Sequence, residues 1–487
     1  MIRDKGIILM LISSLLAYAV MQYIGIGVIP LRSIIEGEDL MLANSMLDAD
    51  VVMDVEGSDV YIAWYDPVKD AVMLKASNDG GSTFREPILV SSTEGVDGVR
   101  VRGIVAKGSY VNLLWSGEVD GQYDIFLGNS KDGALTFSTI NLSNNDGDSE
   151  YPTIDASGPT VYVAWVDLTY GNSEILLRVS RDGGSTFSDV MNVSNSDGES
   201  EAPVLVAEGS NVYLAWHDNT QGVFAVMFRA GYDDGNTFSD PVILSNLDHD
   251  SGFVSMDVEG SSLYTVWMSK EYASNSSNSS DGGDDDSSSR KKKEEVYEFS
   301  IYARYSNDGG RSFSEAVSIG KGISPIVKAD GPLACIVWIV EGGGVQFASM
   351  YGKDMRDAIT IGIDAHAIRS VMLDVEGNTV SMLVVGEVYG AKGKSESKSK
   401  SESESENHSS NSIVYIGSRD SGLTFSSTKV VEGLMVDDVS MLSKGRGVYI
   451  AWSEKVCVEP NCSHVKLGYY FGKSDDLNYR FTVKSII

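Results

Sequence analysis

Residues Ser77-Asn-Asp79-Gly-Gly81-Ser-Thr83-Phe84 form a pattern, Ser-x-Asp-x-Gly-x-Thr-Phe, that recurs along the chain and decides its fold. We call each copy an octapeptide turn. The other copies run from Ser130 to Phe137, Ser180 to Phe187, Gly231 to Phe238, Ser306 to Phe313, Ser418 to Phe425 and, in degenerate form, Ser474 to Phe481. Where no insertion intervenes, they lie roughly 50 residues apart, a period typical of stacked four-stranded units. The repeat therefore predicts a β-propeller.

A second repeat, Gly-x-x-Val-x-Ile-x-Trp, precedes the octapeptide turns and gives the number of blades. Its copies run from Gly57 to Trp64, Gly108 to Trp115, Gly158 to Trp165, Gly209 to Trp216, Gly260 to Trp267, Gly331 to Trp338, Gly377 to Val384 and Gly445 to Trp452. All 7 tryptophans of the chain occupy its last position, and the seventh copy has Val384 there instead. Its apolar runs are typical of strands buried on both faces. We expect the tryptophans to lie between neighbouring blades, with sugar stacking by one of them as an alternative.

The two repeats together predict an all-β protein, an eight-bladed propeller of four-stranded antiparallel blades over residues 48–487. Seven or six blades are the alternatives. In the first blade the expected strands are Val51 to Glu56, one ending at Trp64, one ending in the octapeptide turn, and Pro87 to Ser91. The sixth unit lacks a recognisable octapeptide turn. Residues 39–44 could add a strand that latches the ring.

The N-terminal segment 1–31 has the composition of a signal anchor or a signal peptide. Arg3 and Lys5 precede an uncharged apolar run from Gly6 to Leu31. Such a run, as a helix of about 39 Å, exceeds the bilayer core of about 30 Å. Ala17-Tyr-Ala19 would also suit a signal peptidase. We expect one hydrophobic helix, a short connector over 32–47, and a propeller that is tethered at the extracellular face of the membrane or secreted.

Charge limits the partners that the protein can have. The net charge of −31, from 69 acidic and 38 basic residues, opposes binding to nucleic acid or anionic lipid. Outside the cell, Cys457 and Cys462 could form a local disulfide, whereas Cys335 is expected to be a buried thiol. Sequons for N-glycosylation occur at Asn141, Asn192, Asn275, Asn278, Asn407 and Asn461.

The octapeptide itself has the chemistry of a tight turn. Its glycine supplies a positive φ, and its aspartate accepts hydrogen bonds from the backbone and from the Ser and Thr hydroxyls. These residues resemble the Asp-box, or bacterial neuraminidase repeat, of sialidase-like propellers. The resemblance implies a structural role at the rim, away from any active site, for Asp79, Asp132, Asp182, Asp233, Asp308, Asp420 and Asp476.

The two faces of the predicted ring differ in sequence. Strands of a blade, lettered a to d, alternate in direction, so a–b and c–d turns share one face and b–c and d–a loops share the other, which we call the front face. The first face holds tight turns only. Two low-complexity insertions, 273–295 and 391–412, fall in b–c loops and emerge on the front face. We expect them to be disordered, either as tolerated insertions or as arms that touch a partner.

The front face is also acidic. Asp66, Asp167 and Asp218 each follow a blade tryptophan by two residues. Carboxylates that alternate with glycine suit Ca²⁺, although solvated or turn-capping carboxylates are the alternative. The candidate ligands, in two d–a loops, are Asp146, Asp148, Glu150, Asp197, Glu199 and Glu201. No cofactor is required by the predicted fold, and Ca²⁺ is the one that these loops suit.

The resemblance to sialidases implies three arginines that clamp a sugar carboxylate, beside a Tyr-Glu nucleophile pair and an aspartate. Arg100, Arg102 and Arg369 are the arginines expected on or near inner strands. The family's Phe-Arg-Ile-Pro motif is missing, and an acidic face would repel an anionic sugar. We therefore predict a non-catalytic binding module for glycan, protein or cell-envelope components. A sialidase-like glycoside hydrolase and a structural subunit of the envelope are the alternatives.

Overall fold

The computed structural model describes residues 51–272, 297–340, 343–363, 365–388, 411–434, 436–445, 447–457, 465–474 and 481–485. All of them belong to one compact unit, Asn44–Tyr389 with Ser410–Ile487. The other unit, Met1–Ala43 with Gly390–Ser409, lies outside them, and so do the predicted anchor, the connector and residues 39–44. The described ranges contain no helix that is long and apolar enough to cross a membrane.

The described strands form eight separate antiparallel sheets, one for each predicted blade. Blade 1 consists of β1 (Val51–Glu56), β2 (Asp59–Asp66), β3 (Ala71–Ser77) and β4 (Ile88–Ser92). Blade 2 consists of β5 (Asp97–Lys107), β6 (Tyr110–Val119), β7 (Gln122–Ser130) and β8 (Ser138–Asn141). Blade 3 consists of β9 (Ser149–Ser157), β10 (Thr160–Asp167), β11 (Glu174–Ser180) and β12 (Met191–Asn192). Blade 4 consists of β13 (Ser200–Glu208), β14 (Asn211–Asp218), β15 (Ala225–Tyr232), β16 (Thr237–Phe238) and β17 (Val242–Ile243).

Blade 5 consists of β18 (Ser251–Glu259), β19 (Ser262–Tyr272), β20 (Tyr297–Ser306) and β21 (Val317–Lys321). Blade 6 consists of β22 (Ile323–Asp330), β23 (Leu333–Val340), β24 (Gly344–Tyr351), β25 (Asp354–Met355) and β26 (Ile359–Ile361). Blade 7 consists of β27 (Ala365–Glu376), β28 (Thr379–Val388), β29 (Asn411–Ser418) and β30 (Ser426–Leu434). Blade 8 consists of β31 (Val436–Lys444), β32 (Gly447–Cys457), β33 (Val465–Ser474) and β34 (Thr482–Ser485).

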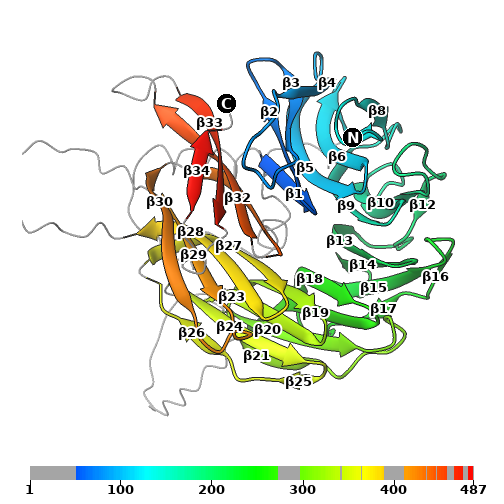
Figure 1. Cartoon of the computed structure of the whole chain (residues 1–487). Coiled ribbons are helices and arrows are strands. Elements are labelled where there is room, and N and C mark those ends of the chain that lie inside the picture. Colours follow the sequence, from blue (N-terminus) through cyan, green and yellow to red (C-terminus); the bar gives the residue numbers. More distant parts are fainter. Residues whose placement is uncertain are drawn as a thin grey trace, which may run out of the picture. The chain divides into compact units, whose positions relative to one another are not determined.

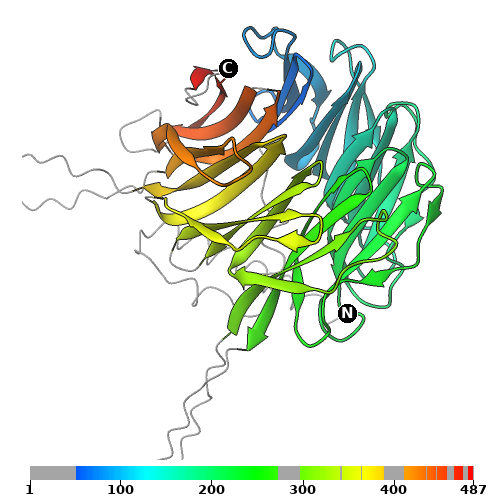
Figure 2. The same cartoon turned by 60° about the horizontal axis from the view of Figure 1, so that its bottom comes forward.

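The eight sheets succeed one another around a ring in sequence order (Figures 1 and 2). Within each sheet the strands pair in chain order, and the first strand of each blade contacts the first strand of the next, from β1 round to β31 and back to β1. Strands a therefore form the inner wall and strands d the outer edge. The structure confirms the predicted eight-bladed propeller. Both insertions fall between a strand b and a strand c, after β19 and after β28.

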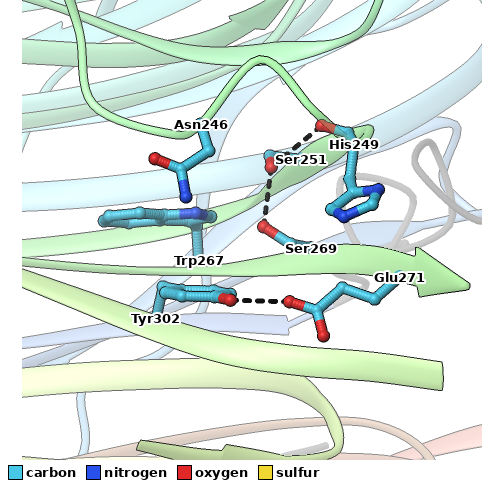
Figure 3. A pocket seen from close by; sticks show the side chains of 7 residues that line it. All are labelled: Asn246, His249, Ser251, Trp267, Ser269, Glu271 and Tyr302. Atoms are coloured by element: carbon cyan, nitrogen blue, oxygen red, sulfur yellow. Dashed lines mark hydrogen bonds between the residues drawn. The ribbon is translucent and has the colours of Figure 1, made fainter. Parts of the chain in front are cut away.

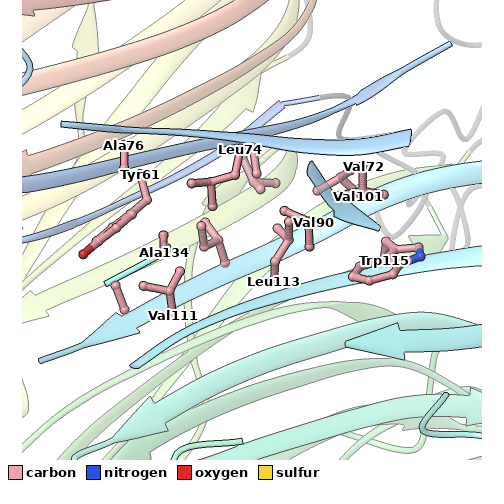
Figure 4. Close-up of a cluster of buried hydrophobic side chains, with 14 of the residues drawn as sticks. Tyr61, Val72, Leu74, Ala76, Val90, Val101, Val111, Leu113, Trp115 and Ala134 are labelled. Atoms are coloured by element: carbon pink, nitrogen blue, oxygen red, sulfur yellow. The ribbon is translucent and has the colours of Figure 1, made fainter. Parts of the chain in front are cut away.

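The repeated tryptophan is buried at seven of the eight seams between blades, and Val384 takes its place in blade 7. Trp64, Trp115, Trp165, Trp216, Trp267, Trp338 and Trp452 all lie on strand b and are at most 1% exposed. Between blades 1 and 2, Trp115 and Leu113 of β6 pack against Leu74 and Val90 of β3 and β4 (Figure 4). Burial of such side chains stabilises each seam by about 1.5–3 kcal/mol per residue.

Blade 8 closes the ring on blade 1 by packing. The Val51 amide donates to Asp438 Oδ2 of β31 at 3.0 Å. Phe84, the last residue of the first octapeptide turn, meets Phe471 of β33 edge to face, with ring centroids 5.0 Å apart. Among the described residues, blade 1 is built from β1 to β4 and blade 8 from β31 to β34. Neither sheet contains a strand from the other end of the chain.

Five octapeptide turns share one hydrogen-bond pattern. In the first, Asp79 Oδ1 accepts from Ser77 Oγ (2.8 Å) and the Thr83 amide (2.8 Å), and Oδ2 accepts from Thr83 Oγ1 (2.6 Å). The same pattern is built around Asp132, Asp182, Asp308 and Asp420.

Blade 4 departs from this pattern. Gly231 replaces the serine, so no hydroxyl is available to hold the following carboxylate. Asp233 and Asp234 instead have φ values of 52° and 56°, and Thr237–Phe238 pairs back onto β15 as a hairpin. The structural role predicted for Asp233 is thus not carried by its carboxylate. Asp476 lies outside the described residues.

In alternate seams, an aspartate of one inner strand accepts a backbone hydrogen bond from the inner strand of the next blade. We call this contact an aspartate clasp. The side chains of Asp54, Asp155, Asp257 and Asp374 each accept a backbone N–H from the next inner strand, donated by Ala106 (2.6 Å), Ala207 (2.8 Å), Ala329 (2.8 Å) and Ser443. Each aspartate stands three residues before the a–b turn glycine of an odd-numbered blade. The even-numbered blades have Val105, Val206, Lys328 and Leu442 at this position.

Candidate functional site

Three consecutive d–a loops of the front face follow one template. They run from Ser143 to Ser149, Ser194 to Ser200 and Ser245 to Ser251. The hydroxyl of each first serine accepts a backbone N–H from strand c of the same sheet, donated by Ile125 (3.0 Å), Ile175 (2.8 Å) and Val226 (2.9 Å). The penultimate residue, an acid, accepts through its side chain a backbone N–H at or just before the start of the preceding strand c. The donors are the amides of Tyr123 (2.9 Å), Ser173 (2.8 Å) and Phe224 (3.0 Å).

In blade 3 a buried carboxylate fills the space behind this loop. Asp167, two residues after Trp165, accepts from Trp165 Nε1 (3.0 Å), Ser149 Oγ (2.9 Å) and Asn145 Nδ2 (2.6 Å). In blade 4 the equivalent Asp218 accepts from Ser200 Oγ at 2.8 Å. These acids are structural elements of the loops.

Glycine is required in the same loops of blades 3 and 4. A Cβ on Gly147 would stand 2.4 Å from the Thr169 amide, and one on Gly198 would stand 2.5 Å from the Thr220 amide. The b–c chain therefore passes directly over each glycine, and the loop is closed.

Blade 5 changes all of these positions together. His249 replaces the glycine, Ser269 replaces the buried aspartate, and Glu271 replaces the threonine. Strand β19 continues to Tyr272 where its counterparts β10 and β14 end at Asp167 and Asp218. The template loop is thus opened in this blade only among the three that share it.

The result is a polar hollow at the seam between blades 4 and 5 (Figure 3). It opens to solvent, and it is lined by Asn246, His249, Ser251, Trp267, Ser269, Glu271 and Tyr302. Trp267 lies at its base, stacked on Tyr302 with ring centroids 6.0 Å apart. Ser269, with its Oγ 2.7 Å from Ser251 Oγ, leaves open the space that Asp167 fills in blade 3.

Two buried nitrogen atoms of the hollow have no hydrogen-bond partner. They are Trp267 Nε1 and His249 Nδ1. Trp165 Nε1 donates to Asp167, whereas Ser269 stands at the equivalent position beside Trp267 and does not pair with its Nε1. Trp216 Nε1 of blade 4 is also unpartnered, although Asp218 follows it. An unsatisfied buried polar atom carries a desolvation penalty of about 1–3 kcal/mol, so these atoms favour a group that can pair with them.

Glu271 is held in place at the rim of the hollow. Its Oε1 accepts from Tyr302 Oη at 2.6 Å, and its Oε2 accepts from Ser300 Oγ at 2.9 Å. The hydrogen bond to Glu271, together with burial, raises the pKa of Tyr302 to about 12. Tyr302 therefore stays protonated and donates, and each carboxylate oxygen keeps a lone pair for another donor.

The predicted arginines lie on two separate blades. Arg100 and Arg102 lie on β5 of blade 2, where Arg100 Nη1 donates to the Val99 carbonyl (3.2 Å) and Arg102 Nε donates to Ser116 Oγ (3.4 Å). Arg369 is exposed at a register shift of β27, in blade 7. Blades 1 and 8 lie between them on one side of the ring and blades 3 to 6 on the other.

The acids predicted to bind Ca²⁺ are dispersed through the template loops. Asp148 and Glu199 accept backbone amides, and Glu201 Oε2 lies 3.3 Å from Nε2 of the buried His217. Burial, reinforced by Asp148, raises the pKa of Glu150. Asp146 and Asp197 are exposed. In the described ranges no three His, Cys, Asp or Glu side chains converge as metal ligands would.

The remaining predicted sites are described only in part. Asn141 Nδ2 donates to Asp124 at 2.9 Å, and Asn192 Oδ1 accepts the Asn195 amide at 2.8 Å, so both side chains build turns. Asn275, Asn278, Asn407, Asn461 and Cys462 lie outside the described residues, as does the side chain of Cys457. Cys335 is a buried free thiol, and burial raises its pKa to about 12.

The sequence reasoning missed the hollow, although a signal for it exists. The predicted ligand-binding residues of the front face were chosen because carboxylates are abundant there, and this criterion favoured the loops of blades 3 and 4. Aligned on their first and last serines, the three d–a loops have equal lengths, and His249 then replaces a glycine. The paired loss of an aspartate at Ser269 strengthens this signal.

Solved structures similar to the chain include polysaccharide lyases, an α-L-arabinofuranosidase and a prolyl endopeptidase. An ulvan lyase of polysaccharide lyase family 25, bound to a GlcA-Rha3S segment, is 9% identical, with a TM-score of 0.45 over 86% of this chain and 90% of that one. Polysaccharide lyase Uly1 is 9% identical, with a TM-score of 0.46 over 71% and 88%. An α-L-arabinofuranosidase from Fusarium graminearum is 11% identical, with a TM-score of 0.35 over 62% and 92%. No protein-family model and no curated protein matches the chain.

Proposed function

We propose that this protein is a non-catalytic glycan-binding module, and that the blade-5 hollow is its binding site. The observation that carries the proposal is the buried, unpartnered Trp267 Nε1 beside His249 Nδ1 and Glu271, at the point where blade 5 abandons the loop template of blades 3 and 4. Hydrogen-bonding groups that converge in a hollow are the usual means of orienting a polar ligand.

The proposal includes a position outside the cell. The apolar segment 1–31, preceded by basic residues, supports a membrane-tethered or secreted protein whose front face meets glycans of the surroundings. Neither a metal nor a cofactor is needed for this role.

Retention on polysaccharides tests the proposal. Full-length protein in detergent micelles is passed over an immobilised neutral β-glucan, chitin and a polyuronate, and the released sugar is assayed. We expect retention without release of product. Trp267→Phe removes the N–H but keeps an aromatic ring, and should weaken retention about tenfold.

Trp216→Phe is the matched control. Trp216 Nε1 is also buried without a partner, but Trp216 does not line the hollow. This variant should therefore bind as the wild type does. Retention on none of the three supports, equal retention of the Trp267 variant, or release of sugar by the wild type would each refute the proposal.

A further inference from the structure

The ligand chemistry of the blade-5 hollow can be narrowed further. We infer that it binds the hydroxyl groups of a neutral sugar and discriminates against uronate and sulfated sugars. The inference rests on the proposed function and identifies the class of glycan.

Hydrogen-bond complementarity is the first argument. Trp267 Nε1–H is a donor only and requires an acceptor. Glu271, already accepting from Tyr302 and Ser300, can take only another donor. A hydroxyl group both accepts and donates, so it can pair with Trp267 and with Glu271, and it suits either tautomer of His249. Carboxylate and sulfate oxygens only accept, so they cannot donate to Glu271.

Charge is the second argument. Glu271 lines the hollow, and the same loop carries Asp248, exposed, and Asp250. No lysine or arginine is among the lining residues. The nearest lysine along β19, Lys270, has its Nζ 4.2 Å from the centre of the Tyr297 ring. An anionic group would therefore enter a negative, partly desolvated site without a counter-charge, which is unfavourable.

Methyl glycosides that differ at one carbon provide the test. Methyl β-glucoside and methyl β-galactoside are titrated into the full-length protein by NMR, together with the uronate counterpart of the tighter binder. We expect the neutral sugar to bind at least tenfold more tightly than the uronate, because the carboxylate cannot donate to Glu271 and is repelled by its charge.

Glu271→Gln tests whether the charge of Glu271 sets the preference, because this variant should keep the local structure. The amide oxygen can still accept from Tyr302, but the negative charge is gone. The neutral sugar should bind about tenfold less tightly, and the preference over the uronate should shrink to less than about threefold. Glu298→Gln is the control, because Glu298 pairs across the strands with Glu271 but does not line the hollow.

The outcomes distinguish this inference from the proposed function. If polysaccharide retention depends on Trp267 but the uronate binds as tightly as the neutral sugar, the inference fails and the glycan-binding function stands. If retention itself does not depend on Trp267, both fail. A Glu298→Gln variant that loses neutral-sugar binding as Glu271→Gln does would also refute the inference.

Discussion

At the residue scale, the second glycine of the octapeptide turn joins two blades. Gly310 has a φ of +78°, and a Cβ there would stand 2.6 Å from Phe228 of the preceding blade. In blade 2 the same position is Ala134, with a φ of 60°. Ala134 packs in the cluster that holds Leu74, the counterpart of Phe228. The residue that faces the turn therefore decides whether a methyl group is tolerated.

Gly310→Ala should lower the free energy of unfolding by about 2–4 kcal/mol, since it adds left-handed strain and overpacking against Phe228. Gly260→Ala, at a φ of +61° with nothing within 4 Å of its Cβ, should lower it by only about 1 kcal/mol. Denaturant unfolding measures both. Adding Phe228→Leu should recover part of the Gly310→Ala loss, and a purely additive double mutant would contradict this explanation.

At the element scale, an aspartate three residues before the a–b turn glycine joins the inner strands in alternate seams, and valine, lysine or leucine stands at this position in the others. Asp155 of β9 accepts the Ala207 amide of β13 at 2.8 Å, whereas Val206 stands at the matching position one blade later. Burial raises the pKa of Asp155, and the hydrogen bonds from Ala207 and Ala156 oppose that shift. The clasp therefore satisfies an inner-strand amide at the expense of partial desolvation of a charge.

Asp155→Val, which copies the valine of blades 2 and 4, should leave the Ala207 amide without its acceptor. Hydrogen exchange at Ala207 should accelerate about tenfold or more, since an unmade hydrogen bond of this kind is worth about 1–3 kcal/mol. The Ala106 amide, held by Asp54, serves as the internal control and should not change. Equal acceleration at both amides would show general loosening of the ring.

The sequence predicted these elements well because each repeat encodes a contact that every seam needs. A tryptophan such as Trp165 must be buried between blades, and a turn such as that of Asp79 has one stereochemical solution. The hollow could not be predicted in the same way. It arises from an absence, the missing carboxylate at Ser269, and from the proximity of His249 and Glu271, which lie in different loops.

At the scale of the whole molecule, two sets of carboxylates respond to acid in opposite ways. Hydrogen bonds from Thr83 and Ser77 lower the pKa of Asp79 to about 2, and similar bonds do the same for Asp308 and Asp420. Burial raises the pKa of Asp374, on the inner wall, from 3.8 to about 6. The folded protein therefore favours the charged form of the turn aspartates and the protonated form of Asp374.

Stability should therefore peak near pH 4. Below pH 3.8 these aspartates are protonated in the unfolded chain but stay charged in the folded protein. The stability that the folded turns provide is therefore lost as the pH falls toward about 2. The stability linked to Asp374 is present below 3.8 and is lost as the pH rises through about 6. Thermal unfolding from pH 2 to 8 measures both limbs. In Asp374→Asn the decline between pH 4 and 6 should shrink, and an unchanged decline would assign it to other groups.

The alternation of inner-wall aspartates also makes neighbouring blades unequal partners. Asp54, Asp155, Asp257 and Asp374 recur in every second blade, so the shortest unit that repeats this contact is a pair of blades. Within each pair, one blade supplies the carboxylate and the next blade supplies the backbone amide. A blade exchanged for its neighbour would therefore leave two carboxylates or two amides facing each other at the inner wall.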